Sequence, residues 1–151
     1  MSIAITLHVL SAVIWVGGMF FAYMALRPAA AKVLEPPPRL KLWVHTFRLF
    51  FVWVWLGVIT LLVTGYWMLF NVFGSFEGAG LHIHLMQGIG IAMVLIYMHV
   101  FFAPYRRLRH AVIVEDWPEG GRQLAMIRKL VALNLLLGLS VIVIAAGGRY
   151  F

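Results

Sequence analysis

The residues Leu81–Pro104, LHIHLMQGIGIAMVLIYMHVFFAP, decide the fold class. The segment is long and apolar enough to cross a bilayer as one helix, which requires about 20 such residues. It nevertheless contains His82, His84 and His99. Because ionisable side chains are costly to place within hydrocarbon, histidines in a membrane span indicate a functional site by default. The question for the rest of the chain is what these imidazoles bind.

The overall composition excludes an ordinary soluble domain. Of the 151 residues, 64% are hydrophobic and 11% are charged, whereas a soluble domain has roughly half and a quarter, respectively. Cysteine is absent, so disulfides, thiolate metal sites and cysteine nucleophiles are excluded. The net charge of +7 is explained by basic connections between membrane spans, not by nucleic acid binding. Met1 is followed almost at once by apolar residues, so we expect no cleaved signal peptide.

Four segments satisfy the length criterion for a membrane span, namely residues 3–26, 43–70, 81–104 and 126–148. The run Pro36-Pro37-Pro38 predicts that no helix continues through the first connection. Pro118 and Gly120-Gly121 predict a loop before the fourth span. No repeat or second domain is visible, and the connections are short. The sequence therefore predicts one all-α domain, an integral membrane four-helix bundle with up-down topology.

Lysine and arginine residues predict how the bundle is oriented. They gather in or beside the first and third connections, whereas the second connection contains only Glu77. The positive-inside rule then places the first and third connections in the cytoplasm and both termini outside. We expect a multi-pass protein of a bacterial inner membrane, with lipid as its surroundings and both termini in the periplasm.

Depth and helical phase distinguish the histidines from one another. His84 and His99 are about 22 Å apart along a helix axis, and their side chains point within about 60° of each other. We interpret them as part of one inward stripe that includes Gly88, whereas His82 faces almost the opposite way. The depths are assigned as follows: near the outer surface, His8, His82 and His84; near the inner surface, His45 and His99; in water, His110.

Matched depths pair His8 with His84 outside and His45 with His99 inside. Pairs of imidazoles in a helix bundle hold b-type haem, and without cysteine no covalent haem attachment is available. The sequence thus predicts one or two haem b groups with bis-histidine ligation. The same four histidines are the predicted ligands of the haem iron.

Glycines and arginines complete the predicted haem sites. Gly18 and Gly88 lie on the faces of predicted ligand histidines, where a missing side chain lets a flat macrocycle approach the backbone. Arginine pairs well with carboxylates such as haem propionates. We expect Arg149 in this role outside, and Arg48 or Arg128 inside.

Several motifs resemble a known family. The segment LHVLSAVIWVGGMFF at residues 7–21 resembles the first span of the CopD-like copper-resistance family and of the related HemJ-type membrane protoporphyrinogen oxidases. ITLLVTGYWML, LHIHL and IRKLVALNLLLGL in the later spans are similar too. The resemblance covers nearly the whole chain and implies a four-helix membrane bundle with a haem b near the outer side and His8 as a ligand. HemJ-type enzymes have a functional lysine where this chain has His84, and a polar stretch where Asn134 is followed by three leucines. Both differences from the HemJ-type enzymes argue against porphyrinogen oxidation as the function of this chain.

The leading functional prediction is a b-type cytochrome that transfers electrons across or along the membrane. A quinone or a redox protein is its expected partner, a homodimer is compatible with the pattern, and an oxidoreductase activity is left open. The first alternative is copper transport or resistance, because His82, His84 and Met86 resemble a copper site at the outer surface. If residue 81 already lies in the helix, His82 and Met86 share a face; if the segment is extended, His84 joins them. The second alternative is a HemJ-like oxidase.

Overall fold

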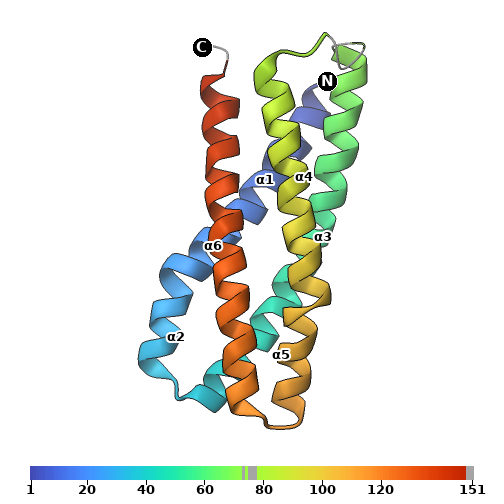
Figure 1. The fold of residues 1–151 in the computed structure, drawn as a ribbon. Coiled ribbons are helices and arrows are strands. Elements are labelled where there is room, and N and C mark those ends of the chain that lie inside the picture. The colour runs from blue at the N-terminus through green and yellow to red at the C-terminus, as the bar shows by residue number, and fades with distance from the viewer. Residues whose placement is uncertain (73, 75–77, 149–151) are drawn as a thin grey trace.

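The computed structural model of the chain describes residues 1–72, 74 and 78–148 and is built from helices, with no strand among these residues. The elements are α1 (Ser2–Phe21), η1 (Ala22–Leu26), α2 (Arg27–Val33), α3 (Pro36–Val72), α4 (Leu81–Phe102), α5 (Pro104–Ile113) and α6 (Trp117–Gly147). In the described part of the chain they form 4 helical stretches long and apolar enough to cross a membrane. The predicted all-α fold with four spans is therefore confirmed (Figure 1).

The stretches run up and down, so the bundle has two different ends (Figure 1). We call the end that holds Ser2, Val72, Leu81 and Gly147 the terminal end. The opposite end, which holds residues 27–41 and 104–129, is the basic end because the lysines and arginines gather there. Both basic connections thus lie at one end, as the charge pattern predicts. Which end faces the cytoplasm stays a prediction.

The connections at the basic end are shorter than the sequence predicts. The helix does break in the first connection, as the Pro36 run predicts, because α2 ends at Val33 and α3 begins at Pro36. Pro118 was expected in a loop, but α6 begins at Trp117. Proline is tolerated in the first turn of a helix because its missing N–H would have no partner there. The Asp116 side chain caps α6 by accepting a hydrogen bond of 3.1 Å from the Glu119 N–H. An Asp followed three residues later by Glu is the signal that could have located this helix start.

The first helix also continues beyond its predicted end. We expected it to stop at Arg27-Pro28, but it passes through the π-helical segment η1 into α2. Inside an α-helix, the ring of Pro28 would clash with the carbonyl four residues earlier. The wider winding of η1 accommodates the proline, as π-bulges do in other helices. Near Pro104 the prediction is right, since α4 ends at Phe102 and α5 begins after a bend at Ala103.

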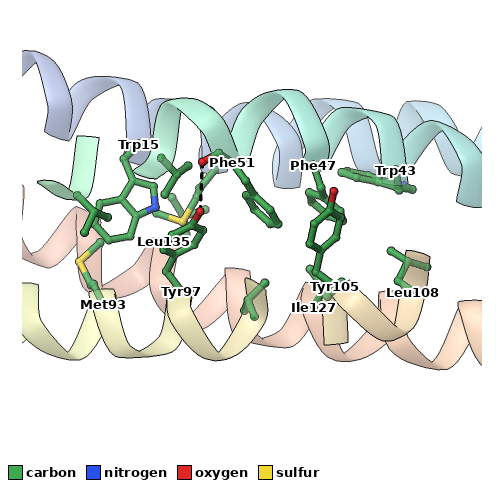
Figure 2. Packing of buried hydrophobic residues seen from close by; sticks show 14 of the residues in the cluster. Trp15, Trp43, Phe47, Phe51, Met93, Tyr97, Tyr105, Leu108, Ile127 and Leu135 are labelled. Carbon is green, nitrogen blue, oxygen red and sulfur yellow. Dashed lines mark hydrogen bonds between the residues drawn. The ribbon is translucent and has the colours of Figure 1, made fainter. Parts of the chain in front are cut away.

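An aromatic column holds the centre of the bundle together (Figure 2). Phe47 and Phe51 of α3 stack at 5.2 Å, and Tyr105 of α5 packs edge-on against Phe51 at 4.9 Å. Tyr97 of α4 donates a hydrogen bond of 3.2 Å from its hydroxyl to the Phe51 carbonyl. Trp15 of α1 meets Tyr97 at 6.0 Å. The column therefore joins three of the four spans.

The predicted inward stripe of the last span is confirmed for Asn134 and Gly138, which are both buried in α6. A side chain at Gly138 would come within 2.8 Å of a Val16 methyl group and 3.1 Å of the Met93 terminal carbon. The glycine thus lets α6 approach α1 and α4 at one point. Arg149, placed on the same stripe by the sequence, lies outside the described residues, as does Glu77.

Candidate functional site

His8 is the most firmly positioned of the predicted ligands. Its ring lies between α1 and α3, half-buried, with Nδ1 at 2.8 Å from the Thr64 hydroxyl oxygen. The ring also packs on the backbone of α3, because a Cβ at Gly65 would be 3.3 Å from the His8 Cε1 atom. Trp15 and Gly18 share this inward face, as the helical phase predicts. Glycine at position 65 is what permits an imidazole to enter the helix interface.

The hydrogen bonds of Thr64 assign a tautomer to His8. The Thr64 hydroxyl donates to the Thr60 carbonyl at 2.6 Å, so its oxygen is left to accept from His8. His8 Nδ1 therefore carries the proton, and Nε2 of the neutral ring has a free lone pair. A histidine held through one nitrogen by a neighbouring group is the usual arrangement of a metal ligand. His8 is thus prepared to bind a metal through Nε2.

The predicted stripe of His84, Gly88 and His99 shares one face of α4, but that face is exposed and not inward. The buried residues of α4 are Met93, Tyr97 and Val100, which lie roughly 160–220° around the helix from His84. Helical phase gives the angle between side chains and cannot say which side meets the neighbouring helices. In the single chain, His84 and His99 therefore point away from the core.

The other residues predicted to contact haem do not gather around a common space. His45 and Arg48 are exposed on α3. The space beside Gly18 is taken by the Phe50 ring, which would be 2.2 Å from a Cβ at this position. A Cβ at Gly88 would meet nothing within 4 Å. Arg128 lines a cavity at the basic end. Of the four predicted ligands, only His8 faces the interior, and both bis-histidine pairings stay predictions.

His82 and Met86 face the interior of the bundle. The helix α4 begins at Leu81 after Gly80, so residue 81 is helical, and His82 and Met86 share a face while His84 does not. This face is the buried one, because Met93 lies about 20° from His82 around the helix. His82 packs against the end of α6, because a Cβ added at Gly148 would lie 2.8 Å from the Cβ of His82. The prediction that His82 and His84 lie on nearly opposite faces is confirmed, but the inward face is that of His82 and not that of His84.

The inward face of α4 therefore presents a row of metal-binding side chains from the terminal end toward the middle. His82 and Met86 are half-buried, and Met93 is 4% exposed. Met93 lies in the same buried cluster as Trp15 (Figure 2). Imidazole nitrogen and thioether sulfur are ligands that suit copper. The sequence analysis overlooked Met93, although its spacing of seven residues from Met86 places both methionines on the same face of a helix.

No cluster of three or more His, Cys, Asp or Glu side chains is found in the part of the chain that the structure describes.

Comparison with known proteins identifies a family. The family model for copper resistance protein D, CopD, matches residues 44–147. The match includes His82, Met86 and Met93 but not His8, which lies before it. Comparisons with curated proteins and with solved structures gave no significant match. The matched segment covers more than half of the chain and extends from α3 to α6, so this chain is a membrane-spanning member of the CopD family.

Proposed function

We propose that this chain binds copper ions at the terminal end of the bundle and moves them into or through the membrane. The observation that carries the proposal is the match to the copper-resistance family over residues 44–147. It favours the copper alternative over electron transfer. Copper is here the substrate and not a resident cofactor.

The inward donors support this function by their chemistry. Without cysteine, a copper ion has only imidazole and thioether groups as soft or borderline ligands. His8 offers a free Nε2 atom, and His82, Met86 and Met93 offer one nitrogen and two sulfur atoms on one face of α4. Thioether ligands favour Cu(I). We therefore propose Cu(I) as the bound ion, with His82 and Met86 as the entry ligands.

The spacing on α4 supports movement along the helix. His82 and Met86 are about 6 Å apart along the axis, and Met93 lies about 10 Å deeper. An ion could thus pass from the surface to the middle of the bundle by exchange between neighbouring donors. Weak binding at several sites permits exit as well as entry, as in other conduction pathways.

The decisive experiment measures Cu(I) affinity of the purified full chain in detergent by competition with a coloured chelator. Matched variants come from the two faces of one helix: His82→Ala and Met86→Leu on the inward face, His84→Ala and Met98→Leu on the exposed face. We expect the inward variants to weaken binding by at least about tenfold, as lost metal contacts do, and the exposed variants to leave it unchanged. Equal losses on both faces, or no copper bound by the unmodified chain, contradict the proposal.

His8 is tested separately through the residue that orients it. Thr64→Val removes the acceptor for the Nδ1 proton, and outer-shell changes of this kind weaken metal binding by about 10–100-fold. Thr64→Ser keeps the hydroxyl and is expected to restore affinity. If Thr64→Val binds copper as well as the unmodified chain, His8 is not a ligand.

Haem b ligation, the first expectation, is tested on the same preparation. Only one of its four predicted ligands faces the interior, so the fold gives it less support than copper. A Soret band in the protein as isolated, with a sharp alpha band on reduction, would establish haem b and contradict copper as the function of His8. We expect a preparation without these bands.

A further inference from the structure

A second site lies at the basic end, away from the inward donors of the terminal end. An open cavity of about 360 Å³ is lined by residues of η1, α2, α3 and α6. The charged residues of its lining are Arg27, Arg39 and Arg128. The three residues come from three different helices and are up to a hundred positions apart in the sequence. Such a convergence of like charges on one cavity is unfavourable unless an anion is bound there.

The cavity contains no acidic side chain that could neutralise these arginines. In the described part of the chain, the only ion pair is Arg122–Glu119, which lies outside the cavity lining. The Nε atom of Arg27 is buried without a hydrogen-bond partner, which is unfavourable for a donor. The Arg27 guanidinium also lies over the Tyr23 ring at 4.4 Å. The site therefore has three cationic residues and no acidic residue in its lining, which gives it a positive potential.

Guanidinium groups bind phosphate oxygens through paired hydrogen bonds, so a phosphate group is the anion that matches best. The rest of the lining is apolar and aromatic, with Trp43, Phe47, Leu124 and Val131 among its residues. From Gly121 to Val131, the lining on α6 extends about 15 Å along the helix axis. The ligand thus needs an anionic head and an apolar body. Tryptophans beside arginines at the end of a membrane span are typical of the headgroup region.

We propose that this cavity binds the phosphate headgroup of an anionic membrane lipid, such as phosphatidylglycerol, with the start of an acyl chain along its apolar wall. Arg27, Arg39 and Arg128 hold the phosphate, and Trp43 and Val131 contact the chain. The site is independent of the copper proposal, because it shares no residue with the inward donors of the terminal end.

The test reconstitutes the full chain in phosphatidylcholine bilayers that contain a trace of spin-labelled phosphatidylglycerol or, in parallel, spin-labelled phosphatidylcholine. Electron spin resonance gives the relative association of each lipid with the protein. We expect the unmodified chain to prefer phosphatidylglycerol. Arg27→Gln, Arg39→Gln and Arg128→Gln should each reduce the preference about fivefold, the effect expected for one basic residue at a membrane surface. Arg107→Gln, an exposed arginine of α5 outside the cavity, should leave it unchanged.

Two results would overturn the proposal. Equal preference of the unmodified chain for both lipids excludes an anionic lipid site, and this measurement does not depend on how any variant folds. Displacement of the labelled lipid by inorganic phosphate alone assigns the site to a soluble anion. Retention of the lipid in excess phosphate, together with loss in the three cavity variants and not in Arg107→Gln, supports the lipid site.

Discussion

Two adjacent glycines of α1 allow a contact between helices to be measured in isolation. A Cβ at Gly17 would meet nothing within 4 Å, whereas a Cβ at Gly18 would lie 2.2 Å from the Phe50 ring of α3. Replacement of either glycine by alanine gives the same gain in helix propensity. The difference in unfolding free energy between Gly17→Ala and Gly18→Ala therefore reports the contact with Phe50 alone.

The magnitude follows from the geometry. To reach an ordinary contact of 3.4 Å, the Phe50 ring must move by 1.2 Å or more from its position. Phe50 contacts Phe51 of the aromatic column at 6.4 Å, so its movement disturbs the packed core. Overpacking of this kind costs about 1–3 kcal/mol. We expect Gly18→Ala to be less stable than Gly17→Ala by that amount.

The assay is reversible unfolding in mixed micelles with increasing dodecyl sulfate, followed by circular dichroism. A double variant, Gly18→Ala with Phe50→Leu, removes the obstructing ring and should recover most of the loss relative to Phe50→Leu alone. If Gly18→Ala is as stable as Gly17→Ala, then Phe50 turns aside freely, and the inference that Gly18 serves helix packing is refuted. The room beside Gly18 would then again be available to a cofactor.

Two further predictions concern single hydrogen bonds. Tyr97→Phe removes the hydrogen bond from the tyrosine hydroxyl to the Phe51 carbonyl. It should lower the free energy of unfolding by about 0.5–1.5 kcal/mol in the same assay, with helix content unchanged. If stability is unchanged, the hydrogen bond from Tyr97 contributes nothing to it. Asp116→Ala removes the cap of α6 and should cost about 0.5–2 kcal/mol. Asp116→Asn keeps the accepting oxygen and should remain close to the unmodified chain, so equal losses in both variants would mean that charge, and not the cap, is responsible.

The spans and their relative phases could be predicted from the sequence because they depend on local pattern. His84 and His99 do share a face, and Asn134 and Gly138 do face inward. Which face of α4 is buried depends on how the neighbouring helices pack against it, and the sequence of α4 alone carries no information about that packing. In a membrane span both sides are apolar, so the usual polar face that marks the outside is missing. The sequence therefore predicted the face of His84 as inward, whereas the inward face is that of His82.

The limits of the helices were less predictable for a different reason. Pro28 was expected to end the first helix, but the helix continues through η1, whose wider winding accommodates the proline. Pro118 was expected in a loop, but it lies at the start of α6, where proline fits. The cavity at the basic end could not be predicted at all. Arg27, Arg39 and Arg128 belong to segments that meet only when the bundle forms, and in the sequence each one is simply a residue of a basic connection.

The gathering of charge at the basic end gives the molecule a large electrical asymmetry along its axis. Eleven of its twelve Lys and Arg residues and four of its five acidic residues belong to the half of the bundle at that end, which places a formal charge of +7 there. A membrane potential acts on each elementary charge with about 2.3 kcal/mol per 100 mV. Moving the basic end to the electrically positive side would thus require roughly 16 kcal/mol at 100 mV. If the basic end faces the cytoplasm, as the charge pattern predicts, the membrane voltage therefore opposes inversion of the chain.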